Sequence, residues 1–157
     1  MAVTAQEIRQ SYPLPVYNYR VEIGADAIAF SEVSGLSIGY EVATYKESPT
    51  GGGAAGPRVI LMPSQPTSPK ITLKKGIVRG KSVATLYNWI ASIKLNQVEK
   101  RDIFIRLCDE AGAPVISWRV INAFPTKLDA PSFDAKSNDV AVESMELQAD
   151  RITIEEA

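Results

Sequence analysis

The sequence predicts a mainly β protein of the α+β class, with two packed antiparallel sheets that form a barrel-like core and one flanking α-helix. Three observations predict this fold. Apolar and polar residues alternate in the front and back of the chain, one segment has helical spacing, and a glycine- and proline-rich stretch separates the halves. A chain of 157 residues is typical of one domain, so we expect residues 1–157 to fold as a unit.

The predicted strands have a period of two, which is the pattern of a half-buried strand. In residues 17–23, Tyr17, Tyr19, Val21 and Ile23 alternate with the polar side chains of Asn18, Arg20 and Glu22. Ile103, Ile105 and Leu107 alternate in the same way, residues 115–123 follow as a strand after a predicted turn at residues 109–112, and residues 141–154 are compatible with one long strand or two. Because the strands precede and follow a single helical segment, the sheets are expected to be antiparallel.

Residues 82–94 change to helical spacing. Ser82 is a candidate N-cap, and the predicted apolar stripe consists of Val83, Leu86, Tyr87, Ile90 and Ile93. Trp89 lies off that stripe, so its ring either reaches the core or contacts another chain.

Residues 48–69 hold four of the ten glycines and five of the ten prolines. Proline lacks the amide donor and glycine adds chain entropy, so the segment is expected to be an extended loop. Gly51, Gly52 and Gly53 form its most flexible part. Its apolar run of Val59, Ile60, Leu61 and Met62 needs a partner surface, since exposing it to water is unfavourable.

Composition argues against an enzyme. The chain has no histidine and a single cysteine, Cys108, so histidine-based catalysis and histidine zinc sites are excluded. The segment Gly76–Ser82 resembles a phosphate-binding loop but has one residue too few between its glycines. A net charge of −1 argues against a specific nucleic-acid partner, and no segment resembles a membrane anchor or a signal peptide. We therefore expect no cofactor and no metal.

Charge is segregated along the chain. Residues 70–81 carry five basic residues and no acid, whereas residues 141–157 carry five acids and one arginine. Either segment forms a solvated face, or a basic patch on one copy meets an acidic patch on the next. The second interpretation makes interface candidates of Lys74, Lys75, Glu143 and Glu146.

Six strings in order resemble a known family. They are residues 14–23 (LPVYNYRVEI), 30–36 (FSEVSGL), 73–77 (LKKGI), 86–90 (LYNWI), 122–127 (NAFPTK) and 140–147 (VAVESMEL). Their order is similar to that of the tail-tube proteins of contractile phages. The similarity extends especially to the inner-tube proteins of extracellular contractile injection systems, and to the haemolysin-coregulated tube protein of type VI secretion.

The resemblance implies a structural subunit: six copies form a ring, and rings stack into a rigid hollow tube inside a contractile sheath. It implies that residues 48–69 are an inter-ring loop and that Trp89 packs near a subunit boundary. It also implies sheath, baseplate, spike and cap partners and a protein toxin cargo in the lumen. We expect assembly in the bacterial cytoplasm, followed by release in an extracellular particle or a virion tail.

Three further interpretations follow from the residues. The polar face formed by Asn18, Arg20 and Glu22 is a candidate for the lumen lining. A barrel with one helix could instead be a small-ligand carrier, which would be monomeric and stabilised by its ligand. The chain could also be a specialised tube paralogue at the baseplate or cap end.

Overall fold

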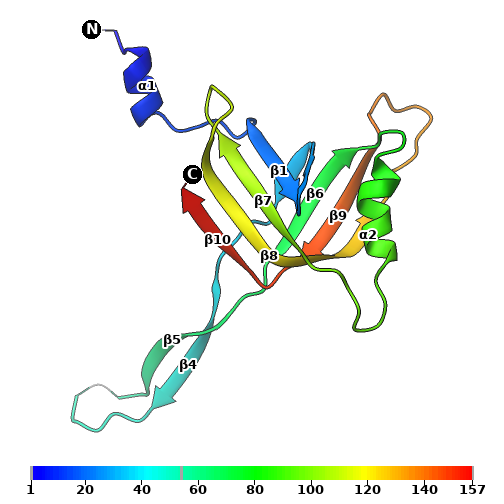
Figure 1. The fold of residues 1–157 in the computed structure, drawn as a ribbon. Helices are drawn as coiled ribbons and strands as arrows, with labels where there is room; N and C mark the ends of the chain where they lie inside the picture. Colours follow the sequence, from blue (N-terminus) through cyan, green and yellow to red (C-terminus); the bar gives the residue numbers. More distant parts are fainter. Residues whose placement is uncertain (1, 54, 157) are drawn as a thin grey trace.

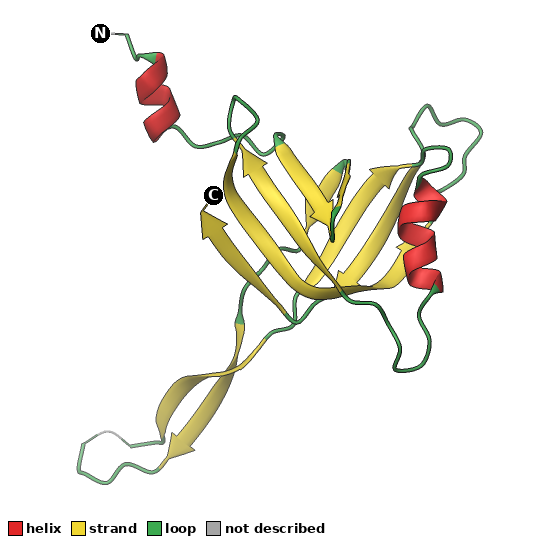
Figure 2. Ribbon diagram, viewed as in Figure 1, coloured by secondary structure: helices red, strands yellow, loops and turns green. Residues whose placement is uncertain are grey.

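The computed structural model describes residues 2–53 and 55–156, which are mainly β (Figures 1 and 2). Residues 1 and 157 of the predicted domain and residue 54 of the predicted loop lie outside the described residues. The elements are, in chain order, α1 (Ala5–Ser11), β1 (Tyr19–Ile23), β2 (Asp26–Ile28), β3 (Glu32–Ser34), β4 (Tyr40–Glu47), β5 (Arg58–Pro66), β6 (Lys70–Gly76), the π-helical turn η1 (Val83–Tyr87), α2 (Asn88–Ala91), β7 (Arg101–Cys108), β8 (Pro114–Asp129), β9 (Val142–Gln148) and β10 (Arg151–Glu156).

Eight strands form one antiparallel hydrogen-bonded network in the order β2-β1-β7-β8-β9-β6-β3, with β10 paired to β8. The 16-residue strand β8 belongs to both layers. Its first half pairs with β7 and β10, and its second half pairs with β9. The predicted fold of two antiparallel sheets is confirmed, although no pairing among the described residues joins β2 to β3, so the barrel stays open.

The bend of β8 between the layers is held by side chains. Asn122 has a φ of 54°, a left-handed conformation that asparagine tolerates better than most residues. Its backbone N donates to Oδ1 of Asp102 at 3.1 Å, and its Nδ2 donates to Oδ2 of Asp150 at 2.8 Å. The long strand can therefore change layers without leaving its polar groups unpaired.

The core lies between the two layers and is built from alternate strand residues. Ile71 and Leu73 of β6, Ile103 of β7, Val120 of β8 and Met145 of β9 are each 0% exposed. A side chain buried in this way contributes roughly 1.5–3 kcal/mol, so the alternation that predicts the strands also builds the barrel.

The helix was predicted at about the right place, and its predicted apolar stripe is right at Leu86 and Ile90, which lie in or against the core, but wrong at Val83 and Tyr87. Residues 83–91 are helical, whereas Val83 is 63% and Tyr87 54% exposed. The buried side is rotated by about one residue and contains Leu86 and Trp89, which are 0% and 2% exposed. Burying Trp89 removes more apolar surface from water than burying Val83 would, so the largest side chain decides the orientation.

Ser82 does not cap the helix as predicted. Its own backbone is helical, with φ −64° and ψ −44°, and its side chain makes no capping bond. Instead its Oγ accepts a hydrogen bond from the backbone N of Val78 at 3.0 Å, which closes the turn after β6.

The prediction of a loop over residues 48–69 was partly wrong. Residues 58–66 form strand β5, which pairs with β4 in a two-stranded sheet, and the other described residues of the segment, 48–53, 55–57 and 67–69, are irregular. The hairpin extends away from the barrel (Figure 1). Proline is tolerated there because both strands are edges, and Pro63 and Pro66 lie in the part of β5 near the barrel, where the register shifts.

Candidate assembly surfaces

The hairpin of β4 and β5 carries exposed apolar side chains on both faces. The register pairs Ala43 with Met62, Thr44 with Leu61 and Tyr45 with Ile60, so neighbouring residues alternate between faces. On one face Tyr40, Val42, Val59 and Leu61 are 62%, 65%, 51% and 68% exposed. On the other, Tyr45 and Met62 are 50% and 43% exposed. Apolar surface on this scale is typical of an interaction site.

The hairpin contributes little to its own stability. An isolated two-stranded hairpin is at best marginally stable in water. Near its tip, Arg58 and Glu47 form an exposed ion pair at 3.8 Å, which is worth about 0–1 kcal/mol. Gly51, Gly52 and Gly53 of the tip have open space around them, as does Gly56. The hairpin therefore has the character of an element that is stabilised by contact with another molecule.

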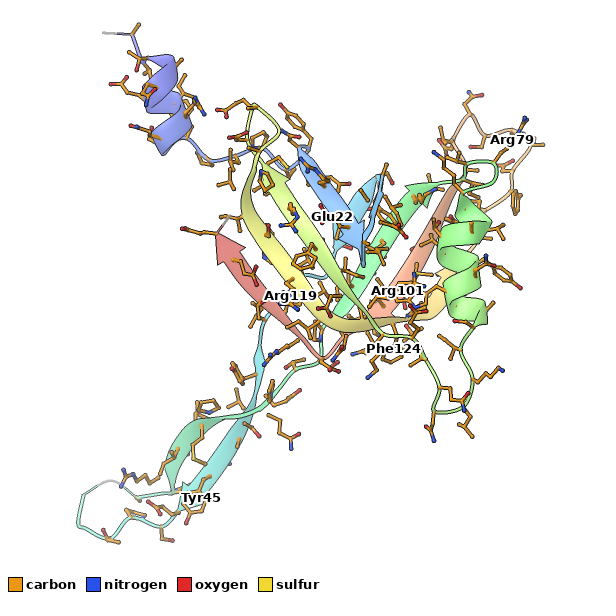
Figure 3. All side chains as sticks on the ribbon, viewed as in Figure 1. Glu22, Tyr45, Arg79, Arg101, Arg119 and Phe124 are labelled. Atoms are coloured by element: carbon orange, nitrogen blue, oxygen red, sulfur yellow. The ribbon has the colours of Figure 1, made fainter. Side chains whose placement is uncertain are left out.

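The sequence prediction placed Val59, Ile60, Leu61 and Met62 in this surface but missed β4. Tyr40, Val42 and Tyr45 supply much of the apolar area. The local pattern of residues 40–47 gives no sign that their strand leaves the barrel. Figure 3 labels Tyr45 on the hairpin, far from the labelled residues of the barrel.

A cleft of about 670 Å³ opens in the barrel between β1, β7 and the segment around β3. Its lining is mostly apolar and includes Val16, Tyr17, Phe30, Leu36, Leu107 and Trp118. Val16 and Tyr17 at its rim are 87% and 81% exposed. The hydroxyl of Tyr19 in the wall donates to the Phe30 carbonyl at 2.7 Å, and burial, together with the charge of Glu32, raises the pKa of Tyr19. The cleft is a second apolar surface that the chain leaves open.

Helix α1 is the third unpacked feature. A complete capping box at Thr4 and Glu7 starts it, with Thr4 N to Glu7 Oε2 at 2.8 Å and Glu7 N to Thr4 Oγ1 at 3.2 Å. None of its residues is buried, and Val3, Ile8 and Tyr12 in and beside it are 53%, 40% and 54% exposed. An exposed ion pair from Arg9 to Glu110 at 3.9 Å links it to the turn between β7 and β8.

The outer face of the layer formed by β1, β7, β8 and β10 is charged. Arg20 and Glu22, two predicted lumen residues, lie on this face of β1. Nη2 of Arg106 bonds Glu22 at 3.3 Å, and its guanidinium lies 4.7 Å from the Phe104 ring centre. Arg20 donates to the Gly112 carbonyl at 2.8 Å. Figure 3 labels Glu22 and Arg119, which lie on the two sides of β7 in this layer.

Asp102 and Arg119 form the shortest ion pair of this charged face, at 2.8 Å. The hydrogen bond from Arg119, followed by that from the Asn122 amide, holds the pKa of Asp102 below its usual value. In turn, the hydrogen bond to Asp102 and the charge of its carboxylate raise the pKa of Arg119. The third predicted lumen residue, Asn18, differs from the others: its Nδ2 donates to the Asp109 carbonyl at 2.6 Å and fixes the turn between β7 and β8.

The predicted separation of basic and acidic patches was wrong. Strand β6 from the basic segment pairs directly with β9 from the acidic segment, with Lys75 opposite Glu143. These two are only 6% and 9% exposed, so they present almost no surface to another subunit. Lys75 donates to the Gly76 carbonyl at 3.2 Å and to Ser82 at 3.5 Å. Oε1 of Glu143 has no hydrogen-bond partner among the described residues.

Lys74 and Glu146 point to the opposite face of the same layer. Lys74 is half-buried, with its side chain 45% exposed, and pairs with Glu32 at 3.1 Å. Glu146 is half-buried and lies opposite Lys127 in the register between β8 and β9. Only these two of the four charged interface candidates keep accessible side chains.

Trp89 takes the first of its two predicted alternatives, the core. Its Nε1 donates to the Glu99 carbonyl at 2.8 Å, and the Arg101 guanidinium covers the ring at 4.8 Å from its centre. Because Trp89 is 2% exposed, it offers almost no surface of its own to another subunit, and the location of the helix near a subunit boundary stays a prediction. A large indole stabilises the short helix against the barrel.

The described residues contain no group of three or more cysteine, aspartate or glutamate side chains arranged to hold a metal ion. Cys108 is buried. In the part of the chain that the structure covers, no helix has the length and apolar character needed to cross a bilayer. The hairpin, the cleft and helix α1 are three apolar surfaces that the described residues leave unpacked, and such surfaces suit assembly.

Comparisons with known proteins agree with this arrangement. Residues 15–153 match the family of the T4-like virus tail tube protein gp19. A chain of the PVC sheath-tube complex, from an extracellular contractile injection system in its extended state, is 43% identical with a TM-score of 0.88, over 99% of this chain and 100% of that one. No curated protein sequence matches.

Two further solved structures are similar. A chain from the anti-feeding prophage cap (the AFP tube terminating cap) is 44% identical with a TM-score of 0.84, over 100% of both chains. Hcp1 from Flavobacterium johnsoniae is 17% identical with a TM-score of 0.52, over 90% of this chain and 97% of that one. At this identity the second likeness concerns the fold alone.

The exposed apolar surfaces of this open antiparallel barrel and its hairpin suit a structural protein that associates with other copies of itself. The chain is a member of the T4-like virus tail tube protein gp19 family, and it is a tail tube subunit and not an enzyme. The resemblance inferred from the six sequence strings is confirmed. A small-ligand carrier is not favoured, because the family and the structural relatives are tube proteins.

Proposed function

We propose that six copies of this chain close into a ring and that rings stack into the inner tube of an extracellular contractile injection particle. The observation that carries the proposal is the hairpin of β4 and β5, whose two apolar faces have no cover within the described chain. Stacking supplies that cover. The similarity over nearly the whole length to chains of a sheath-tube complex and a tube terminating cap supports the same assembly.

Ring closure would use the free strand edges. Strands β2 and β3 end the hydrogen-bonded network, and β10 pairs only with β8 among the described strands. Free edges are a liability in a monomer and are removed when a closed ring pairs them with neighbours. Lys74 and Glu146 are the accessible charged candidates for these contacts.

The charged face with Arg20 and Glu22 is proposed to line the lumen. Its charges are paired, as in Glu22 with Arg106 and Asp102 with Arg119, so the face is polar without a strong net field. Such a wall would let a folded or unfolded protein toxin pass without binding it tightly. Asn18 would support the rim of this wall by holding the β7–β8 turn.

The proposed partners are a contractile sheath outside the tube, a baseplate with its spike at one end and a cap at the other. No membrane anchor and no specific nucleic acid take part. Assembly would occur in the bacterial cytoplasm, and the tube would leave the cell in the released particle or in a virion tail.

Negative-stain microscopy of the purified chain, alone and with its baseplate, tests the proposal. Long hollow tubes are expected, whereas a specialised cap-end or baseplate-end paralogue would give single rings. Material that stays monomeric beside the baseplate would refute the tube assignment. Replacing Ile60 and Leu61 with Asp should leave the monomer folded, as judged by circular dichroism, and abolish stacking.

A further inference from the structure

The two protruding elements of the chain leave the barrel at opposite ends. In Figure 1 the hairpin of β4 and β5 extends downward, whereas helix α1 lies at the top beside the turn between β7 and β8. The rim of the cleft belongs to the same end as α1. Asn18, next to rim residue Tyr17, bonds the Asp109 carbonyl in that turn, and Arg9 of α1 pairs there with Glu110.

The hairpin needs two covers, one for each face. Leu61 and Val42 on one face are 68% and 65% exposed, and Tyr45 and Met62 on the other are 50% and 43% exposed. A single flat partner would bury one face and leave the other in water. Because removing apolar surface from water is favourable, covering both faces stabilises the assembly more than covering one.

The end with α1 offers two apolar surfaces. One is the cleft, with Val16 and Tyr17 at its rim. The other is α1, which has seven residues, too few for a helix to be stable alone, and has no buried residue. Its exposed Ile8 and Tyr12 are available for contact. Two uncovered surfaces at one end therefore correspond to two uncovered faces at the other.

The hairpin strands and helix α1 each carry balanced charges, which favours an apolar contact between them over an electrostatic one. The strands of the hairpin carry Glu41 and Glu47 against Lys46 and Arg58, and α1 carries Glu7 against Arg9. Each element is thus neutral overall, so neither repels a second copy of the other. Binding through such elements depends little on ionic strength.

We propose that, between stacked rings, the hairpin of one subunit is clamped by a second copy, with the cleft on one face of the hairpin and helix α1 on the other. The proposal rests on the stacked tube of the proposed function and names the surface that receives the hairpin. It also accounts for the complete capping box on a seven-residue helix with no buried residue: the capping box favours the helix, and packing against a hairpin stabilises it.

Disulfide trapping in full-length chains tests the clamp. Ile8→Cys reports on α1 and Val16→Cys on the cleft rim, and each is combined with Leu61→Cys or Met62→Cys on opposite hairpin faces. All four sites are at least 40% exposed, so the substitutions leave the core intact. Native Cys108 is buried and gives little background. Leu95→Cys combined with Leu61→Cys is the matched control, because Leu95 is 91% exposed but lies in the connection between α2 and β7.

Oxidised tubes should give covalent multimers longer than six subunits on a non-reducing gel, because each link joins one ring to the next. Ile8→Cys should link to one hairpin face and Val16→Cys to the other, and the Leu95→Cys control should stay monomeric. Normal tubes without such multimers, multimers that stop at six, or equal linking by the control would overturn the clamp and leave the tube intact. Loss of tubes by the unmodified chain would instead refute the proposed function.

Discussion

The barrel and the hairpin are both built from antiparallel strands, yet the apolar side chains of the barrel core are buried and many of those on the hairpin are exposed. Leu73 of β6 is 0% exposed, and Leu61 of β5 is 68% exposed. Both lie in paired antiparallel strands, and the neighbours of each side chain along its strand point to the opposite face. The difference is the partner: β6 packs against the opposite layer of its own barrel, whereas β5 pairs only with β4 and has no layer to cover it.

This contrast separates two sources of stability. The barrel completes its core within one chain, so it folds before assembly. The hairpin has the backbone hydrogen bonds of a sheet without the burial that normally stabilises one, so its stability is expected to come from neighbouring subunits.

Hydrogen exchange should show the largest difference between the two regions. In free subunits the amides of β4 and β5 and of residues 48–57 should open at almost no cost in free energy. The amides of β6 and β7 should approach the global value, about 5–15 kcal/mol for a domain. Tubes should protect the hairpin. Equal protection of β5 and β6 in free subunits would contradict the comparison.

Two leucine truncations should separate folding from assembly. Leu73→Ala removes a fully buried side chain and should lower the free energy of unfolding by about 2–5 kcal/mol. Leu61→Ala should change the free energy of unfolding of the free subunit by less than about 0.5 kcal/mol, because the Leu61 side chain is exposed. Denaturation of monomers and the critical concentration for tubes measure the two effects, and Leu61→Ala should raise the critical concentration.

Gly35 lies at the root of the hairpin, just after β3. It has a φ of 85°, and an added Cβ would collide with the Lys70 carbonyl oxygen. Gly35→Ala should therefore destabilise the free subunit by about 1–3 kcal/mol and displace the hairpin. Gly24→Ala is the control, since Gly24 has a φ of 61° but open space around it. Similar unfolding midpoints for the two variants would argue against the close contact at the root.

The smallest effect concerns acid stability of the barrel. Because Arg119 and the Asn122 amide lower the pKa of Asp102 in the folded state, the ionised carboxylate stabilises the fold above its unfolded pKa, about 3.9. This contribution is lost as the pH falls below about 4 towards the folded pKa. Asp102→Asn should remove less than about 1 kcal/mol at neutral pH and flatten the acid limb of the stability curve. The hairpin should not respond, which two-dimensional NMR of both regions can check.

Much of the fold could be predicted because alternation reports directly on burial. The strands containing Val21 and Ile103 were found from their period of two, and both side chains are in the core. The helix was located but rotated, since stripes through Val83 and through Trp89 are equally regular in one dimension. Only packing against the barrel selects between them.

The assembly surfaces were harder to predict from the sequence than the strands. The run from Val59 to Met62 indicated an unsatisfied apolar surface, and this signal was local. Val16, Leu107 and Trp118 line the same cleft although they are far apart in the chain. No local sequence pattern predicts that such distant residues lie together. Likewise Lys75 and Glu143 belong to segments of opposite charge, and only strand pairing places them side by side in the interior.

By itself the sequence determined the mainly β class, the place of the helix, the lack of histidine chemistry and the tube family, because composition, period and motif order are properties of the chain read in one dimension. Only the tertiary structure decided which apolar residues are covered and which remain exposed, and that α1 and the hairpin leave from opposite ends. Burial depends on what lies across from a side chain in space, and for the hairpin that neighbour lies outside the chain.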